Sequence, residues 1–225
     1  MAINGMDVSH YPGDANMAWL RANGAFRVTG FYLTHWPMKP DKSWLKKRQT
    51  LAGLGWGFLP TYVGLQSGSA GLNAQNGARD AAEAVNLMGQ AGFPTSSVIY
   101  LDIEDGGTPA AAFDAYISAW VAAVAKLKFT PAFYCSHDLI AWARRKSDIV
   151  WSFRVPEGTN GETYDPTNLP AAKIDKNCIA TQYRQEIKLK GLTIPPSVDK
   201  GIDLDLCQVP DPSNFAAVHH ALGLG

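Results

Sequence analysis

The sequence predicts an α/β protein built as a single (β/α)8 TIM-like barrel that occupies residues 1–225. Short apolar segments of strand length alternate with segments of helical periodicity from one end of the chain to the other. No linker or change in composition divides them, which favours one domain. No glycine-rich phosphate-binding turn follows the first strand, where Asp7-Val8-Ser9 stands instead. An open doubly wound sheet would more often carry such a turn, so a closed barrel is favoured.

Eight strands are predicted, each as a run of aliphatic, β-branched and aromatic residues bounded by glycine, proline or polar residues. In chain order they span residues 5–9, 28–34, 57–63, 98–104, 130–136, 149–154, 179–183 and 202–207.

Helical patterns fill the intervals between these strands. The clearest has Thr108 as its cap and Pro109 as its first residue, with an apolar face that runs from Phe113 to Val124. A second helix is predicted from about Asn76 to a stop at Gly92. Other helices are predicted to start near Asp14, Asp41 and Ser136, and the last to start at Asp211 and Pro212 and end before Gly223.

Three long loops follow predicted strands, at residues 64–75, 156–177 and 184–200. In a parallel barrel, loops that follow strands gather at the C-terminal end of the barrel, where active sites of this fold are built. We therefore expect these loops to surround a cleft.

The charge balance narrows the classes of partner. With 20 basic and 20 acidic side chains the formal net charge is zero, which argues against a nucleic-acid groove or a polybasic membrane surface. An uncharged substrate fits this balance better. No apolar stripe remains after the helices are assigned, so a monomer is expected.

No cofactor, zinc cluster or disulfide framework is expected. Cys135, Cys178 and Cys207 are too few and too irregularly spaced for a disulfide framework or a zinc cluster, and each lies in an apolar run. We expect three buried thiols.

Residues 1–9 lack the basic and apolar regions of a signal peptide, and no apolar run is long enough to span a bilayer. A role outside the cytoplasm would then require non-classical or specialised export, and the protein would otherwise be cytoplasmic.

The most informative residues close the fourth strand. Side chains alternate along a strand, so Tyr100, Asp102 and Glu104 share one face, at the end where barrel sites are built. Paired carboxylates are the usual groups that cleave glycosidic bonds. Helix caps or surface charges are the alternative interpretation, but residues 105–109 already supply a turn and a cap.

Two more strands carry carboxylates on one face: Asp7 on the first, and Asp203 and Asp205 on the eighth. These strands are neighbours in a closed barrel, so their carboxylates would approach Asp102 and Glu104. Mutual repulsion would raise the pKa of the least solvated carboxyl group. Glu104 has the longer reach and is predicted to be the general acid, with Asp102 ionised below it.

Other residues at late strand positions are candidates for stacking on sugar rings or for hydrogen bonds to hydroxyl and acetamide groups. Core packing is the alternative role for each of them. They are Tyr62, Tyr100, Tyr134, Trp151 and Gln182, and Asp205 is counted with them as a substrate-binding candidate.

Four motifs in order resemble glycoside hydrolase family 25, the bacterial and phage muramidases. They are Asp7-Val8-Ser9, Asp102-Ile103-Glu104, Thr181-Gln182-Tyr183 and Ile202-Asp203-Leu204-Asp205. The chain is more similar still to the related glycoside-hydrolase-like family once labelled domain of unknown function 1906, through residues 30–34 (Gly-Phe-Tyr-Leu-Thr) and 59–64 (Leu-Pro-Thr-Tyr-Val-Gly). The resemblance spans nearly the whole chain.

This resemblance implies a barrel that cleaves peptidoglycan or a related N-acetylated glycan. It implies Glu104 as general acid, Asp102 as its partner, and Asp7 and Asp203 as supporting carboxylates. The muramidases usually have asparagine where this chain has Asp205. The extra acidic group is compatible with a changed substrate or with loss of activity.

Two other functions remain open. One is a barrel that binds a cell-wall carbohydrate without catalysis, since fold does not imply function. The other is a hydrolase that uses the carboxylates as ligands for Mg²⁺ or Ca²⁺. A catalytic zinc is not expected, because His10, His35 and His137 are dispersed. The residues do not decide between attack by a substrate acetamide and a direct role for a carboxylate as nucleophile or base.

Overall fold

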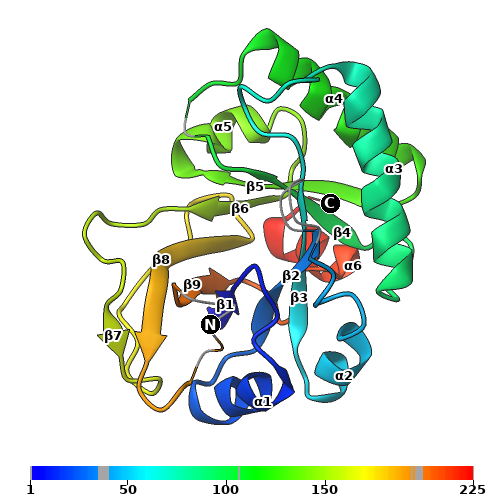
Figure 1. The fold of residues 1–225 in the computed structure, drawn as a ribbon. Coiled ribbons are helices and arrows are strands. Elements are labelled where there is room, and N and C mark those ends of the chain that lie inside the picture. Colours follow the sequence, from blue (N-terminus) through cyan, green and yellow to red (C-terminus); the bar gives the residue numbers. More distant parts are fainter. Residues whose placement is uncertain (1, 35–40, 106, 194, 196–199, 225) are drawn as a thin grey trace.

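A closed barrel forms the centre of the computed structural model, which describes residues 2–34, 41–105, 107–193, 195 and 200–224 (Figure 1). The barrel strands are β1 (Ile3–Asp7), β2 (Val28–Thr34), β3 (Gly57–Val63), β4 (Val98–Ile103), β5 (Thr130–Ser136), β6 (Val150–Phe153), β8 (Ala180–Leu189) and β9 (Ile202–Cys207). Their order around the barrel is β6-β5-β4-β3-β2-β1-β9-β8, and β6 pairs with β8 to close the ring. The predicted single TIM-like barrel is confirmed.

The last strand runs against its neighbours. The strands from β1 to β6 and β8 are parallel, whereas β9 is antiparallel to both β1 and β8. A short connection suits an antiparallel pair, while a parallel pair needs a crossover of about a dozen residues or more, usually a helix. Because β9 is reversed, its first residues lie at the C-terminal end of the other strands. We call that end the mouth.

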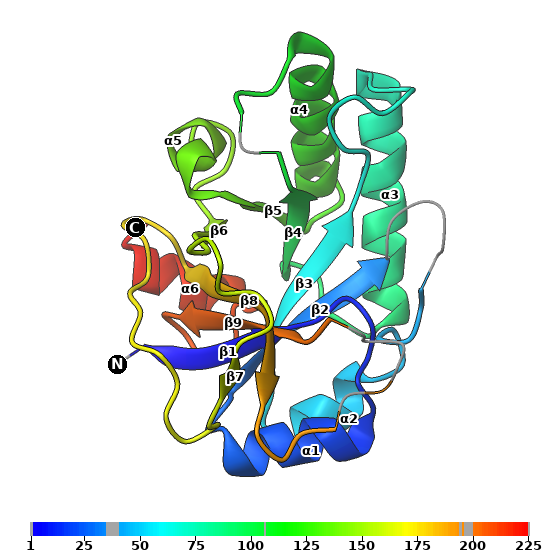
Figure 2. The ribbon, with the colours of Figure 1, turned by 60° about the vertical axis from the view of Figure 1, so that its left-hand side comes forward.

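The helices are α1 (Asp14–Asn23), α2 (Arg48–Gly53), α3 (Ala74–Gln90), α4 (Ala111–Lys126), α5 (Ile140–Ala143), which continues the 3-10 turn η1 (His137–Leu139), and α6 (Phe215–Leu222). Figures 1 and 2 show α3 and α4 packed side by side on the outside of the barrel. Helix α6 instead closes the end opposite to the mouth, where Val218 packs against residues inside the barrel.

Two apolar cores lie on the two faces of the barrel wall. The inner core includes Val28, Leu59, Val98 and Trp151, and the outer core, between the wall and the helices, includes Phe31 and many others. The alternation of side chains along each strand assigns the residues to one core or the other. The inner core packs the barrel interior, so the barrel is a filled structure with a site at its mouth.

Several element ends differ from the sequence prediction. Helix α4 begins at Ala111, after the predicted Thr108 and Pro109, and α2 begins at Arg48, well after Asp41. Helix α6 is capped by Asn214 because Asp211 serves another contact, accepting the backbone N–H groups of Phe58 and Ser213. Gly223 ends α6 in the left-handed conformation, as predicted.

Two of the predicted loops contain strand. β8 continues to Leu189, so only residues 190–201 connect it to β9, and the short strand β7 (Thr163–Tyr164) pairs with this extension of β8. The pairing of β7 with β8 lies beyond the closed part of the barrel, where β8 projects as an arm (Figure 1).

The three cysteines are free and buried, as predicted. Within the described residues, no helix has the length and apolar character that a membrane crossing requires.

The contact between α3 and α4 depends on Gly77. A Cβ atom at this position would lie 2.1 Å from the backbone oxygen of Tyr116 on α4, so a side chain would force the helices apart. We expect Gly77→Ala to lower the free energy of unfolding by about 1–3 kcal/mol, the usual cost of overpacking. Gly89→Ala is the matched control in the same helix, because a Cβ there meets nothing within 4 Å. Urea denaturation of both variants checks this, and equal stability of the two would contradict it.

Candidate active site

Four carboxyl groups project into the barrel near its mouth. Asp7 ends β1, Asp102 lies near the end of β4, and Asp203 and Asp205 lie on β9. Asp7, Asp102 and Asp205 are 2%, 4% and 0% exposed, and Asp203 is partly exposed. Asp203 pairs with Asp7 across the sheet, while Asp205 pairs with Gly5, one layer deeper. The reversal of β9 therefore puts Asp203 nearer the mouth and Asp205 below it.

Two glycines make room for these carboxyl groups. A Cβ atom at Gly30 of β2 would lie 2.5 Å from the Cβ of Asp7, and one at Gly5 of β1 would lie 3.0 Å from the Cβ of Asp205. The small residues on neighbouring strands let acidic side chains fit inside a narrow barrel.

Neutral hydrogen-bond donors hold the carboxyl groups in place. The Tyr32 hydroxyl donates to Asp7 Oδ1 (2.7 Å), and the Trp151 Nε1–H donates to Asp205 Oδ1 (3.0 Å). Asp203 accepts from Gln182 Nε2 (2.8 Å) and from the backbone N–H of Glu186 (2.7 Å). The Tyr134 hydroxyl donates in turn to Gln182 Oε1, which fixes the orientation of that amide.

The four carboxyl groups are buried without basic side chains beside them, and burial raises the pKa of each. No ion pair joins them to a basic side chain within the ranges that the structure describes. Burial raises the pKa of Asp7 to about 6, although hydrogen bonds from Tyr32 and Asp205 work against the rise. The pKa values of Asp102, Asp203 and Asp205 rise well above the ordinary range through burial and then through the charges of nearby acidic groups, including Asp7.

Glu104 lies above Asp102, just past the end of β4, and is exposed at the mouth. Partial burial of its carboxyl group and the adjacent Asp105 raise its pKa. Burial and the charges of Glu104 and Asp7 raise the pKa of Asp102, which opposes the expected ionised state of this group in the free protein. The two groups interact electrostatically, as the shared strand face predicts.

A side-chain amide holds the strand end that carries Glu104. Gln66, in the loop after β3, donates from Nε2 to the backbone oxygen of Asp102 (2.9 Å). Its Oε1 accepts the backbone N–H of Glu104 (3.1 Å), and Asp105 accepts the backbone N–H of Ser67 (3.0 Å). Gln66 thus extends the ladder of β4 by one step and fixes the direction in which Glu104 leaves the strand.

Replacing Gln66 with methionine, which is similar in size but forms neither hydrogen bond, should lower the free energy of unfolding by about 1–3 kcal/mol. The loss arises because the Asp102 carbonyl and the Glu104 N–H lose their partner in a largely buried place. Urea denaturation measures it, with the exposed Ser67→Ala as the control. A methionine variant as stable as the wild type would show that the amide contributes nothing to holding this segment.

A cleft of about 580 Å³ opens beside the mouth, and Ser136, Phe153 and Gln185 are among the residues that line it. Ser136 and Phe153 end their strands as partners in the sheet. The ring of Phe153 lies 5.3 Å from that of Tyr134, which links the cleft to the hydrogen-bonded carboxyl groups.

Not all of the predicted site residues reach the mouth. Tyr62 points outwards, where its hydroxyl donates to Glu83 of α3 (2.7 Å). Tyr100 is fully buried below Asp102 and donates to the backbone oxygen of Pro212 (3.0 Å) at the closed end. Trp151 and Asp205 are also fully buried, and they bond to each other. These four positions therefore support the site or the helix layer without lining the cleft.

Three residues near the site were absent from the sequence prediction: Tyr32, Gln66 and Phe153. The alternation of side chains could have identified Tyr32 and Phe153. Tyr32 lies four residues after Val28, and Phe153 lies two residues after Trp151, so each shares the inward face of its strand with an inner-core residue. Gln66 lies in a loop and has no periodic signal.

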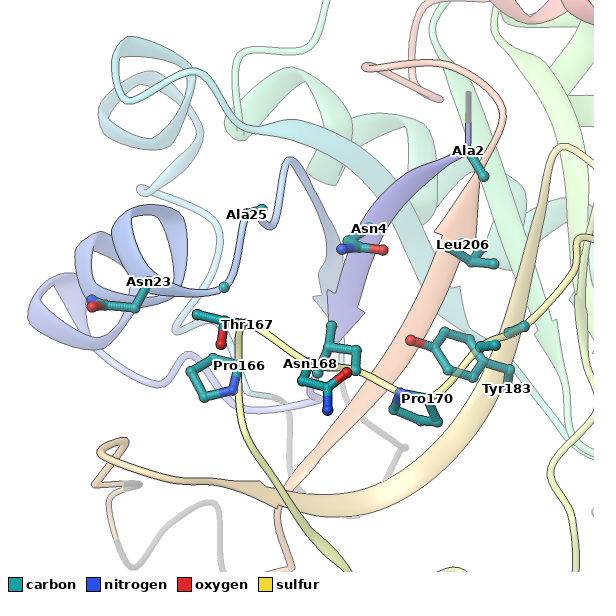
Figure 3. Close-up of a pocket in the computed structure, with 14 residues that line it drawn as sticks. Ala2, Asn4, Asn23, Ala25, Pro166, Thr167, Asn168, Pro170, Tyr183 and Leu206 are labelled. Atoms are coloured by element: carbon teal, nitrogen blue, oxygen red, sulfur yellow. The ribbon is translucent and has the colours of Figure 1, made fainter.

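A second cavity, of about 540 Å³, lies on the outer wall of the barrel (Figure 3). It is lined by Asn4 of β1, Tyr183 of β8, Leu206 of β9 and the segment 166–172. No carboxylate or basic side chain is among its lining residues. It therefore lacks the groups for acid–base chemistry, and the candidate active site is at the mouth.

The carboxyl groups do not form a metal site by their geometry. No group of three or more His, Cys, Asp or Glu side chains suited to a metal ion occurs in the part of the chain that the structure describes. His35, considered among the dispersed histidines, lies outside the described residues.

Comparison with known proteins places this geometry in context. A family model described as "Rv2525c-like, glycoside hydrolase-like domain" matches residues 18–200. A search of curated protein sequences found no significant match.

Among solved structures, the chain is similar to the Tat-secreted protein Rv2525c of Mycobacterium tuberculosis bound to L-tartrate (17% identity, TM-score 0.67, covering 94% of this chain and 98% of that chain). It is also similar to a family 25 glycosyl hydrolase of Bacillus anthracis (14%, 0.56, 92% and 89%). A third is the autolysin LytC of Streptococcus pneumoniae in complex with a synthetic peptidoglycan ligand (13%, 0.58, 91% and 46%). At these identities the likeness shows the fold, a glycoside hydrolase-like barrel shared with lytic enzymes.

Proposed function

Because the chain belongs to the family of Rv2525c-like, glycoside hydrolase-like domains, we propose that it hydrolyses a glycosidic bond in peptidoglycan or a related N-acetylated glycan. The observation that carries the proposal is the position of Glu104, an acid with a raised pKa at the mouth of a barrel, two residues after the buried Asp102. A general acid needs both exposure to the substrate and a proton near neutral pH. The likeness to the autolysin with a peptidoglycan ligand supports this class of substrate.

In the proposed reaction Glu104 gives its proton to the glycosidic oxygen as the bond to the anomeric carbon breaks. The positive charge that develops on the sugar ring favours the ionised form of Asp102 below it, which gives its proton to water before the bond breaks and takes one back from water after the product leaves. Asp102 then orients a substrate acetamide or acts directly on the anomeric carbon or an incoming water. Water supplies the new hydroxyl group, and its other proton goes to Glu104, or to Asp102 if Asp102 activates the water, in which case Glu104 is reprotonated from solvent.

Asp7 and Asp203 support these two groups from across the barrel. Asp7 contributes to the raised pKa of Asp102, and it is held by Tyr32. Asp203 fixes Gln182, and through it Tyr134, at the side of the cleft. We propose that Tyr134 faces the glycan on this side, together with Phe153, while the buried Gln182 holds the Tyr134 hydroxyl in place.

The proposal includes a location. A glycan of the cell wall lies outside the cytoplasm, so the protein would act after export. The structurally similar Rv2525c is described as a Tat-secreted protein. The proposal fails in this respect if fractionation of the native cells finds the protein confined to the cytoplasm.

Digestion of purified sacculi tests the proposed activity. The products are reduced with borohydride, and mass spectrometry then identifies the sugar at the new reducing end, which tells which bond was cleaved. Glu104→Gln protein purified in the same way is the blank for contaminating hydrolases. Muropeptides released only by the wild type support hydrolysis. If neither protein releases products while both sediment with sacculi, the barrel is a binding module and the proposed reaction is wrong.

A further inference from the structure

Two of the buried carboxyl groups face each other without an ordinary donor between them. Asp7 and Asp205 lie on paired strands, two residues apart in the register, and their side chains interact as hydrogen-bond partners in their pKa shifts. Each has one oxygen, Oδ1, that accepts a hydrogen bond, from Tyr32 and Trp151 respectively. The other oxygen of each, Oδ2, is buried and has no donor within the described structure.

A proton is the simplest partner for both oxygens. Two ionised carboxylates repel each other and have no hydrogen to share, whereas a carboxylic acid donates to a carboxylate. Buried polar atoms without a partner are rare in folded proteins, because each costs free energy. One proton between Asp7 and Asp205 satisfies both Oδ2 atoms and removes one of the two buried charges.

The surroundings decide which group keeps this proton. Asp205 is the deeper one, fully buried one layer below the mouth, where a charge costs most. Asp7 lies at the end of β1, nearer to the mouth. We propose that Asp205 is a proton-carrying positioning residue, whose neutral carboxyl group donates a hydrogen bond to Asp7 and leaves Asp7 as the group that ionises.

The direction of the pKa shifts agrees with this assignment. The contact with Asp205 lowers the pKa of Asp7, and the same contact raises the pKa of Asp205. Other titratable groups act on the pair from the surrounding strands, and all are acidic or neutral. They are Tyr32 on β2, Asp102 on β4, Tyr134 on β5, Tyr183 on β8, and Asp203 and Cys207 on β9.

The consequence for catalysis rests on the proposed function. With Asp205 neutral, the layer below Asp102 and Glu104 holds the single charge of Asp7, hydrogen-bonded on both of its oxygens. With Asp205 ionised, a second charge would accumulate there and would disfavour ionisation of Asp102 when the sugar becomes positive. Asp205 thus acts through Asp7 and touches no substrate.

Titration of Asp7 in the free protein tests the proposal and needs neither substrate nor activity. The wild type, Asp205→Asn and Asp205→Leu are labelled with ¹³C at the aspartate carboxyl carbon and followed by NMR. The signals of Asp7 and Asp205 are assigned by comparison with Asp7→Asn and Asp205→Asn. In the wild type we expect Asp7 to titrate at about 6 and Asp205 to stay protonated at that pH.

The asparagine variant keeps a donor of the same shape, so the midpoint of Asp7 should stay within about half a pH unit of the wild type. If Asp205 were ionised instead, removing its charge would lower that midpoint by about one unit or more, and the proposal would be overturned. The leucine variant removes the donor and should raise the midpoint by about one unit, a tenfold gain in proton affinity.

An unchanged midpoint in Asp205→Leu would also contradict the proposed donation. Should Asp205→Leu not fold, the asparagine variant and the wild-type signal of Asp205 still decide the question. A protein that binds sacculi without cleaving them would overturn the proposed function and leave this result standing.

Discussion

Glu104→Gln should lower the rate of muropeptide release by about 10²–10⁴-fold, the usual contribution of a general acid. Glutamine has the same shape as glutamate and cannot deliver a proton to the glycosidic oxygen. The leaving group would then depart as an alkoxide, which is a far poorer leaving group than an alcohol. The measurement is the initial rate of soluble muropeptide release from sacculi at fixed enzyme concentration.

The fold should be unaffected by this change. Glu104 is exposed, and its backbone N–H, which Gln66 binds, is retained in the variant. The melting temperature of Glu104→Gln should therefore match that of the wild type. Glu83→Gln is the matched control, because Glu83 lies on α3 outside the barrel and glutamine can still accept the Tyr62 hydroxyl. We expect full activity from this control.

The pH profile adds a second test of Glu104. Its pKa is raised, so the wild type should remain active above the pH at which an ordinary glutamate has lost its proton. Activity should then decline as the pH rises through the pKa of Glu104, because the acid form disappears. Wild-type activity in Glu104→Gln at any pH would rule out the acid role.

Raising the pH from about 4 to 8 should destabilise the folded protein by several kcal/mol. A carboxyl group with a raised pKa in the folded state binds its proton more tightly there than in the unfolded chain. Its contribution to stability is present in full below the ordinary pKa of 3.8 and is lost as the pH rises towards the folded value. For Asp7, with a folded pKa of about 6, the loss is on the order of 3 kcal/mol. Asp102, Asp203 and Asp205 extend the loss to higher pH.

Asp102→Asn isolates one of these contributions. Asp102 Oδ1 is buried without a donor, so an amide of the same shape removes the cost of ionising the group and disturbs no hydrogen bond of that oxygen. We expect the variant to be more stable than the wild type at pH 8 and similar to it at pH 4. Urea denaturation across this pH range measures the difference, and the exposed Asp148→Asn should follow the wild-type profile. A wild type that gains stability as the pH rises would show that the interior carboxyl groups are ionised and stabilised.

The bounds of a strand are predicted well where the local residue pattern determines them. β2, β3, β5 and β9 have the predicted bounds, because each is a compact run of strand-forming residues between clear breakers. The grouping of Asp7, Asp102 and Asp203 near one end of the barrel also followed from alternation and chain order. The alternation of side chains between the two faces of a strand follows from the backbone geometry, so it holds whatever the strand packs against.

The direction of β9 could not be predicted in this way. A strand has the same period of two in either direction, and its polarity depends on the connection that precedes it. Asp203 pairs with Asp7, which agrees with the prediction that the two carboxyl groups approach each other. The pairing is antiparallel, however, whereas the prediction assumed a parallel strand. The reversal exchanged the depths of Asp203 and Asp205 in the barrel.

Tyr62 shows a second limit. β3 is buried on both faces, so its residues read as one apolar run and the sequence does not tell the inner face from the outer one. Tyr134 and Tyr62 hold similar late positions on their strands, yet only Tyr134 points into the barrel. Which face of a strand points into the barrel depends on how that strand packs against the rest of the barrel, so it cannot be read from the strand alone.

The closure of the barrel by α6 has a practical consequence for attaching the protein to a solid support or to a fused domain. β1 starts at the closed end and α6 packs there, so a tether joined to either terminus leaves from the side opposite to the mouth (Figure 2). Immobilised on a bead by its C-terminus, the protein would present its open end to an insoluble polymer too large to diffuse around it. A fused anchoring domain would do the same at a cell surface.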